Sequence, residues 1–341
     1  MKNLFEGNIF DWSSWARIFQ SVEAWEPLIH FILEKEKLPV SKIENLEPGT
    51  NAVFKTENHV SHFQNSVSFG NGFGKTSLTT GFSTKSKVAF PKTEVLEKPH
   101  VVKIFAPKES GADSSRDFKS EIFALSFARS MGVSVPKLVA CGEIEDKYIF
   151  KYMIMEYIEG INFTGASAKF TADDKFSFAK DLREITDLLN KPCESFNGID
   201  VIHDQSRYKR WDIFSERFKK ERLEYLNSHH FGENVFVHGD LCADNILLNN
   251  KGKIYIIDFA DSAAAPLEYE HAHLVGELFR FDKSYLHGYF GEYRTDELAD
   301  LCFAGLLIHD FGGGIVANNI AEPKEIDSLW DLRDKIHELI K

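Results

Sequence analysis

Two short motifs in the second half of the chain limit what it can fold into more than any other feature. The first runs from His238 through Asp240 to Asn245, and the second ends at Asp258, 18 residues after Asp240. An apolar run precedes each motif, and Asn250-Lys251-Gly252 between them is typical of a tight turn joining two strands. This order predicts short strands and a loop that carry Asp240, Asn245 and Asp258 into one crevice.

These three side chains have the chemistry that phosphoryl transfer requires. One carboxylate must orient the attacking hydroxyl and accept its proton. Hard oxygen ligands must hold Mg²⁺, which neutralises the charge of the phosphates. The alternative is that both motifs are ordinary turns at strand ends, but their order and spacing favour a site built from Asp240, Asn245 and Asp258.

The pattern HGDLxxxN followed by IDFAD resembles the aminoglycoside phosphotransferase and choline kinase family, which shares the protein-kinase fold. The resemblance covers the chain from about residue 43 to about residue 307. It implies an α+β, bilobal, protein-kinase-like fold with an antiparallel sheet in the N-terminal lobe and a helical C-terminal lobe. It also implies that Asp240 is the catalytic base, that Asn245 and Asp258 are Mg²⁺ ligands, and that His238 holds the catalytic loop in place.

The resemblance implies two further residues upstream. Lys103 lies in the apolar strand pattern Val101–Phe105, where the family has a lysine that holds the phosphates of the nucleotide. Glu121 lies on the next expected helix, which runs from Phe118 to Gly132, and would be the carboxylate that pairs with this lysine. Each could instead be an ordinary solvated side chain, but their order relative to Asp240 favours the nucleotide-binding role.

The adenine ring of ATP would be held by the backbone at the end of a later strand. The stretch Met155–Gly160 resembles the linker between the two lobes in this family. We assign the carbonyl group of Glu156 and the N–H group of Ile158 to the adenine, with a register uncertainty of one residue. The nucleotide is expected to be ATP, and GTP is the alternative that the sequence leaves open.

The loop that covers the phosphates has two candidates. Gly49, Thr50 and Asn51 belong to a turn that resembles the short phosphate loop of the family, where backbone N–H groups face the phosphates. Lys103 follows 52 residues after Asn51, and a Gly- and Ser-rich insertion at about 58–93 accounts for this distance. The second candidate is the glycine-rich stretch 70–76 inside the insertion, whose spacing misses a Walker A loop by one residue.

Asp310-Phe311-Gly312 imitates a metal-binding motif of protein kinases, but it follows an apolar helical run rather than a strand. We therefore prefer Asp258 as the metal ligand. The glycines at 312–314 are expected to end that helix.

The chain is expected to divide into two lobes. Residues 1–158 would form the N-terminal lobe, with a helical extension at 1–40 in which Pro27 is a break or a first-turn residue, and a strand-rich nucleotide-binding part at 41–158. Residues 159–341 would form the helical lobe with the catalytic loop and the acceptor site. Helices are expected near 178–189, 211–226, 267–281, 295–309 and 326–340.

Composition excludes several other classes of protein. Lys and Arg number 40 against 52 Asp and Glu, a net charge of −12, which disfavours a nucleic-acid partner. No apolar run has the length of a membrane span or the form of a signal peptide. Four widely separated cysteines indicate a reducing compartment, so we expect a cytoplasmic protein. The sequence leaves the oligomeric state open.

The function expected from the sequence is ATP-dependent phosphorylation of a hydroxyl group on a small molecule, such as an aminoglycoside. A cationic substrate could bind to acidic side chains near the crevice, of which the candidates are Asp261, Glu268, Glu270 and Asp310. The family more often has Gly-Asp where this chain has Ala265-Pro266, which weakens inference about the substrate. The alternatives are a kinase of an amino alcohol, amino acid or sugar, and a kinase-fold protein that binds nucleotide without catalysis.

A protein kinase is a further alternative that the sequence disfavours. Only 83 residues follow Asp258, and they contain no visible activation segment.

Overall fold

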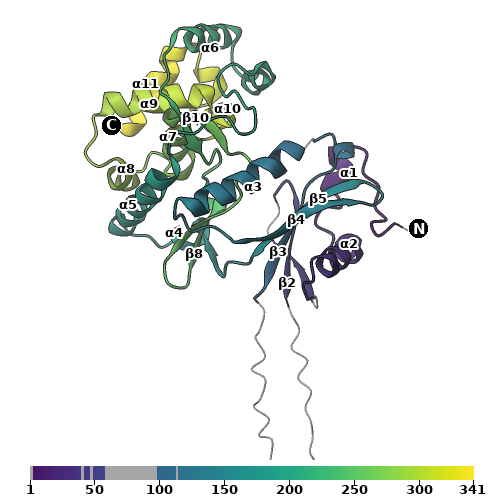
Figure 1. The fold of residues 1–341 in the computed structure, drawn as a ribbon. Coiled ribbons are helices and arrows are strands. Elements are labelled where there is room, and N and C mark those ends of the chain that lie inside the picture. Colours follow the sequence, from purple (N-terminus) through teal and green to yellow (C-terminus); the bar gives the residue numbers. More distant parts are fainter. Residues whose placement is uncertain (1–2, 40–41, 47–48, 58–97, 113) are drawn as a thin grey trace, which may run out of the picture.

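The structure is a computed structural model that describes residues 3–39, 42–46, 49–57, 98–112 and 114–341. Two lobes are visible in Figure 1, one built around a sheet and the other built mainly from helices. The predicted α+β, bilobal, kinase-like fold is confirmed. The predicted boundary at residue 158 remains a prediction.

The sheet of the first lobe has five antiparallel strands in the order β1-β2-β3-β5-β4. Side chains of β2 alternate between buried and partly buried, as expected for a strand with one face on a core. Residues 58–97 stand between β2 and β3 in the sequence and lie outside the described residues, so the predicted insertion and the candidate loop 70–76 do too. The strands are β1 (Lys42–Asn45), β2 (Ala52–Glu57), β3 (His100–Ile104), β4 (Leu138–Glu145) and β5 (Ile149–Glu156).

Two helices near the N-terminus, α1 (Trp12–Ala16) and α2 (Val22–Lys35), supply apolar side chains to the core of this lobe. The ring of Trp25 packs edge-on against Phe150 of β5 at a centroid distance of 5.2 Å. The expectation that Pro27 breaks the helix or opens its first turn is wrong, because Pro27 is the sixth residue of α2. Ser21 caps the helix, and five apolar side chains buried along α2 offset the hydrogen bond that proline cannot make.

Helix α3 (Ser115–Ser130) joins the sheet lobe to the helical lobe (Figure 1). Its aromatic side chains reach across: the ring of Phe127 stacks on Phe236 of the second lobe at 4.7 Å. Gly132 follows the helix with a φ of +84°, the left-handed conformation in which helices commonly end. Helix α3 therefore contacts both lobes.

The helical lobe contains eight α-helices among the described residues. The helix predicted at 211–226 begins later, at Glu216, because Ser215 caps it and residues 205–211 form a separate 3₁₀-helix. The helix over Lys283–Phe290 (α8) was not predicted. The expected helix 267–281 ends in a π-helical segment over Leu274–Leu278. The α-helices are α4 (Phe163–Ser167), α5 (Ala172–Leu189), α6 (Glu216–Ser228), α7 (Leu267–His273), α8 (Lys283–Phe290), α9 (Thr295–Ile308), α10 (Gly312–Ile315) and α11 (Leu329–Ile340).

The glycines at 312–314 do not end the preceding helix, contrary to expectation. Helix α9 ends at Ile308, and Gly312 instead begins α10. A Cβ atom on Gly312 would lie 2.0 Å from the carbonyl oxygen of Leu306, and one on Gly313 would lie 2.6 Å from that of Arg210. These glycines allow close backbone packing.

Short strands hold the loop that carries the first motif. β7 (Asn234–Val237) pairs with β10 (Ala263–Pro266), and β8 (Ile246–Asn249) pairs with β6 (Gly160–Asn162) and β9 (Ile254–Ile256). The loop from His238 to Asn245 therefore runs from one small sheet to the other.

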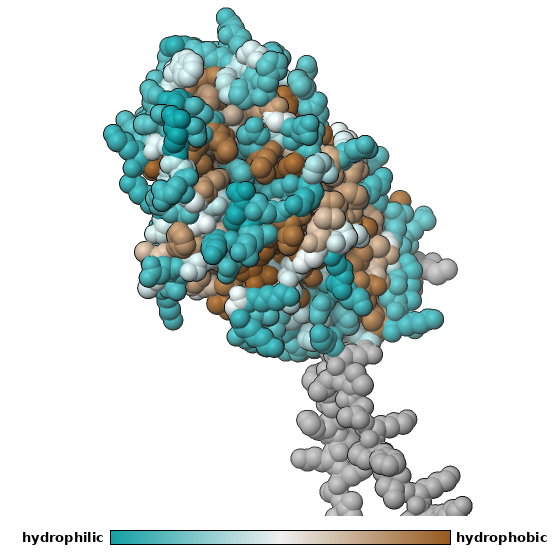
Figure 2. Space-filling model, turned by 60° about the vertical axis from the view of Figure 1, so that its left-hand side comes forward, coloured by the Kyte–Doolittle hydropathy of each residue, from teal (hydrophilic) through white to brown (hydrophobic). Residues whose placement is uncertain are grey.

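On the face shown in Figure 2, apolar surface gathers toward the middle of the molecule between hydrophilic outer parts. Within the described part of the chain, no helix combines the length and apolar character needed to cross a membrane.

Candidate active site

A buried lysine joins the two lobes through two ion pairs. Lys103 on β3 lies with its Nζ atom 2.7 Å from Oε2 of Glu121 on α3 and 2.8 Å from Oδ1 of Asp258. Burial alone would lower the pKa of Lys103, but the carboxylates of Asp258 and Glu121 outweigh it and raise that pKa. The lysine is therefore fully charged at neutral pH. The structure brings these three predicted residues together.

Asp258 follows β9 in an unusual backbone conformation. Its φ angle is +58°, a left-handed value that aspartate tolerates better than most residues. Burial would raise the pKa of this carboxyl group, but Lys103 more than compensates and lowers it. The side chain is 44% exposed, so an ionised carboxylate is held by Lys103 and still open to the crevice.

Asp240 and Asn245 lie side by side in the loop between β7 and β8. The Nδ2 atom of Asn245 donates to the carbonyl oxygen of Asp240 at 2.8 Å and to its Oδ2 atom at 3.0 Å. Burial would raise the pKa of Asp240, but contacts with His273 and Asn245 lower it. The carboxylate therefore stays ionised and able to accept a proton.

Two buried side chains, Glu270 and His238, hold the backbone of this loop through hydrogen bonds. Glu270 on α7 accepts the N–H groups of His238 and Gly239, both at 3.1 Å. The Nδ1 atom of His238 accepts the N–H of Asp240 at 3.2 Å, and its Nε2 atom lies 3.0 Å from the carbonyl oxygen of Ile257. His238 thus connects the loop to the residue before Asp258.

Gly239 allows the loop to approach the second motif closely. Its φ angle is +84°, and a Cβ atom there would lie 2.2 Å from the carbonyl oxygen of Asp261. No other residue type fits this position without moving the backbone.

The sequence made Glu270 one of four candidates for contact with a cationic substrate, and it did not single out His273. Glu270 is fully buried and engaged by the loop, so its expected role as an acidic substrate contact is wrong. His273 is three residues further along α7, on the same face, and its Nε2 atom lies 3.4 Å from Oδ1 of Asp240. The signal in the sequence is that Glu270 and His273 are three residues apart on one expected helix.

Asp310 is also unavailable for a cationic substrate. Its carboxylate forms ion pairs with Arg207 and with Arg210, the latter at 2.6 Å. Asp261 is exposed at the surface, and partial desolvation together with the carboxylates of Asp240 and Asp258 raises its pKa to about 7. Glu268 is partly exposed.

The predicted phosphate loop lies between β1 and β2, next to Lys103 in the sheet. Gly49 and Thr50 are exposed, and the carbonyl oxygen of Thr50 accepts the Nε1–H of Trp15 at 2.9 Å. Asn51 is buried, and its Oδ1 atom accepts the N–H of Ala106 at 3.2 Å. The Asn51 side chain therefore fixes the turn, and Gly49 and Thr50 present the exposed backbone.

The predicted adenine contacts lie at the end of β5. The N–H of Glu156 donates to Lys137, and the N–H of Tyr157 donates to Pro99, both to carbonyl oxygens. Ile158 lies two residues after the end of β5.

The two oxygen ligands available here suit Mg²⁺, which takes few ligands from a protein. They do not suit a metal ion whose ligands all come from the protein. Asn245 uses its Nδ2 atom on Asp240, which leaves its oxygen for a cation, and Asp258 offers a carboxylate. Among the described residues, no group of three or more His, Cys, Asp or Glu side chains could hold a metal ion. Mg²⁺ commonly takes one or two protein ligands and completes its shell with phosphates and water.

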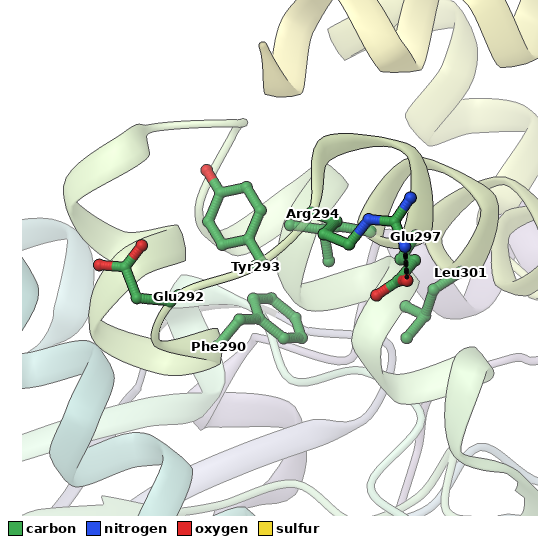
Figure 3. Close-up of a pocket in the computed structure, with 7 residues that line it drawn as sticks. Phe290, Glu292, Tyr293, Arg294, Glu297 and Leu301 are labelled. Atoms are coloured by element: carbon green, nitrogen blue, oxygen red, sulfur yellow. Dashed lines mark hydrogen bonds and ion pairs between the residues drawn. The ribbon is translucent and has the colours of Figure 1, made fainter.

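A cavity elsewhere on the helical lobe contains none of the predicted residues (Figure 3). It has a volume of about 400 Å³ and lies between α8 and α9. The only charged groups that line it are Glu292 and an ion pair of Arg294 with Glu297 at 2.9 Å.

Comparisons with a family model and with solved structures both give matches. A model of the phosphotransferase enzyme family matches residues 92–302. A solved thermostable mutant of aminoglycoside phosphotransferase APH(4)-Ia, in ternary complex with AMP-PNP and hygromycin B, is 15% identical. It covers 91% of this chain and 97% of its own, with a TM-score of 0.54. The GDP complex of wild-type aminoglycoside 2'-phosphotransferase-IIIa is 16% identical with a TM-score of 0.51, covering 91% of this chain and 97% of its own.

At such identities these structures show a shared fold. No curated protein sequence matches the chain. The family match, however, spans more than half of the sequence and includes Lys103, Glu121 and both motifs. The predicted resemblance is thereby confirmed: this protein belongs to the phosphotransferase enzyme family.

Proposed function

As a member of this family the protein is a small-molecule phosphotransferase, and we propose that it transfers the γ-phosphoryl group of ATP to a hydroxyl group. The observation that carries the proposal is the link from Glu121 through Lys103 to Asp258, with Asp240 and Asn245 in contact beside it. Phosphoryl transfer depends on positioning and electrostatic stabilisation, and this arrangement supplies both.

Asp240 is the proposed base. Its ionised carboxylate accepts the proton of the acceptor hydroxyl as the hydroxyl oxygen bonds to the γ-phosphorus and the bond to the β-phosphate oxygen breaks. ADP leaves, and the proton remains on Asp240 until it is released to water. Lys103 neutralises phosphate charge, and the exposed backbone of Gly49 and Thr50 faces the phosphates.

Asn245 and Asp258 are the proposed ligands of Mg²⁺, which when bound supplies positive charge beside the phosphates. Glu156 and Ile158 are the proposed adenine contacts. Two similar structures hold AMP-PNP and GDP. ATP is the proposed nucleotide here, and GTP is the alternative to test.

The proposed acceptor is a small, hydroxylated molecule, and an aminoglycoside is the first class to test. One similar structure contains hygromycin B. Of the four acidic residues considered for a cationic group, Glu270 and Asp310 are engaged within the protein, so Asp261 and Glu268 carry this part of the proposal. Amino alcohols, amino acids and sugars are the alternative acceptors.

The test is a screen for ADP formation from MgATP with hygromycin B, other aminoglycosides, choline, amino acids and sugars. One acceptor should increase ADP formation at least tenfold over water, and a phosphorylated product should be found by mass spectrometry. Nucleotide binding without any transfer, to these acceptors or to water, would instead support a binding protein without catalysis.

A further inference from the structure

A histidine on α7 lies against the proposed catalytic carboxylate from the side opposite to Asn245. His273 is 1% exposed, and its Nε2 atom lies 3.4 Å from Oδ1 of Asp240. The other oxygen, Oδ2, accepts the Nδ2–H of Asn245 at 3.0 Å. Each oxygen of the carboxylate therefore faces one partner, which leaves little freedom for the Asp240 side chain to rotate.

A second histidine fixes the ring of His273. The imidazole of His309 stacks on it with ring centroids 4.8 Å apart and an interplanar angle of 25°. The His309 ring also packs on the ring of Tyr269, with the ring centroids 4.0 Å apart. The Nδ1 atom of His309 accepts the N–H of Phe311 at 3.0 Å. The N–H group of Phe311 and the ring of Tyr269 on α7 therefore fix the position of the His309 ring.

The hydrogen positions of the two rings follow from these contacts. Because Nδ1 of His309 accepts a hydrogen bond, its Nε2 atom carries the hydrogen in the neutral ring. Desolvation strongly lowers the pKa of His309, so the ring is neutral. An Nε2–H on His273 would face the carboxylate, which leaves its Nδ1 atom as an acceptor. Nδ1 of His273 and Nε2 of His309 are both buried and have no hydrogen-bond partner among the described residues.

We propose that His273 is a positioning residue for Asp240, donating its Nε2–H to Oδ1 and holding the carboxylate toward the acceptor hydroxyl. The inference rests on the proposed function, in which Asp240 is the base. The distance of 3.4 Å is long for a hydrogen bond, but catalytic hydrogen bonds often shorten only when substrate binds. Helix α7 then makes two contacts with the loop. Glu270 holds the loop backbone, and His273 orients the Asp240 side chain.

A nearby histidine shows what a structural role looks like. His271, two residues earlier on α7, is 5% exposed and packs edge-on against Tyr289 and Phe290. It occupies the side of the helix that faces α8, and its ring contacts among the described residues are with Tyr289 and Phe290. A substitution there tests loss of a buried imidazole without loss of the Asp240 contact.

The experiment compares His273→Leu, His273→Gln, His271→Leu and Asp240→Asn with the unaltered protein. Hydrolysis of MgATP with water as acceptor gives kcat and KM, and titration with MgADP gives nucleotide affinity. For His273→Leu we expect kcat to fall about 10- to 100-fold, because small displacements of a catalytic group have effects of this size. KM for ATP and the affinity for ADP should stay within about twofold, since His273 is not placed at the nucleotide.

The conservative variant His273→Gln distinguishes a positioning role of His273 from a defect in folding. His273→Gln places an amide N–H where Nε2–H was, so it should recover most of the lost kcat. His271→Leu should keep kcat within about twofold of the unaltered protein. The inference alone is overturned if Asp240→Asn is inactive while His273→Leu keeps the activity of His271→Leu, or if His273→Gln is no better than His273→Leu. If Asp240→Asn is as active as the unaltered protein, the proposed function fails as well.

Discussion

The Nζ atom of Lys103 lies 2.8 Å from the Oδ1 atom of Asp258, although 155 residues separate them in the sequence. One residue belongs to the sheet of the first lobe and the other to the loop after β9 in the second. Since Glu121 on α3 holds the same ammonium group, Lys103 links the sheet and α3 to the loop that carries Asp258.

Replacing Lys103 with methionine should reduce turnover without unfolding the protein. Methionine fills a similar volume but leaves two carboxylates without their cation, one of them buried. We expect kcat/KM for ATP to fall at least 100-fold, which corresponds to about 2.7 kcal/mol of lost transition-state stabilisation. Steady-state ATP turnover checks this.

Lys151→Met is the matched control, because Lys151 lies on β5 of the same sheet and pairs with a half-exposed carboxylate, Glu143. Its kcat/KM should stay within about twofold, as exposed ion pairs contribute little. Equal losses in the two variants would contradict the special role of Lys103.

Replacing Glu270 with glutamine should destabilise the catalytic loop. The amide can accept one of the two backbone N–H groups that Glu270 now accepts, but its NH₂ group faces the other. A buried donor left without an acceptor costs about 1–3 kcal/mol, so the free energy of unfolding in urea should fall by that amount. Glu268→Gln, on the same helix but partly exposed, should change it by less than about 0.5 kcal/mol.

The contact between Trp15 and Thr50 should control nucleotide affinity. Trp15→Phe keeps an aromatic ring in the core but removes the hydrogen bond to the carbonyl oxygen of Thr50. We expect KM for ATP to rise about threefold to tenfold, with kcat nearly unchanged, since a neutral hydrogen bond contributes about 1 kcal/mol. Trp12→Phe is the control, because Trp12 is 47% exposed. An unchanged KM in Trp15→Phe would show that α1 does not support the phosphate loop.

Stability should decrease in mildly acidic solution because of buried neutral histidines. Desolvation lowers the pKa of His271 to about 3, below its value near 6.5 in the unfolded chain. Below pH 6.5 the unfolded chain therefore binds more protons than the folded protein, and stability falls as pH falls from 6.5 toward 3. Burial lowers the pKa of His309 in the same direction.

At pH 5 the contribution of His271 alone is a loss of about 2 kcal/mol relative to pH 7. Urea unfolding of the unaltered protein and of His271→Leu at pH 7 and pH 5 measures it. The variant should lose about 2 kcal/mol less than the unaltered protein between these two pH values. Parallel losses would show that His271 is not the source.

The sequence could predict most of the fold because the strands and motifs carry strong local patterns. Lys103, Glu121 and Asp258 were found through their order along the chain, and the structure places them in contact. Pro27 was misread because local propensity argues for a break, whereas packing of α2 on the sheet decides the outcome.

The errors at the site have a common physical cause. The sequence shows that Glu270 and Asp310 are acidic, but it cannot show that Glu270 caps a loop or that Arg207 and Arg210 neutralise Asp310. His273 escaped notice because its partner is 33 residues away and the link exists only once α7 is placed beside the loop.

The proposed mechanism is tested most directly by measuring turnover and nucleotide binding in Asp240→Asn. Asparagine keeps the size of the side chain and removes the group that accepts the proton. We expect kcat to fall at least about 1,000-fold, with the affinity for MgADP within about threefold of the unaltered protein. Turnover close to that of the unaltered protein would contradict the assignment of Asp240 as the base, and with it the proposed mechanism.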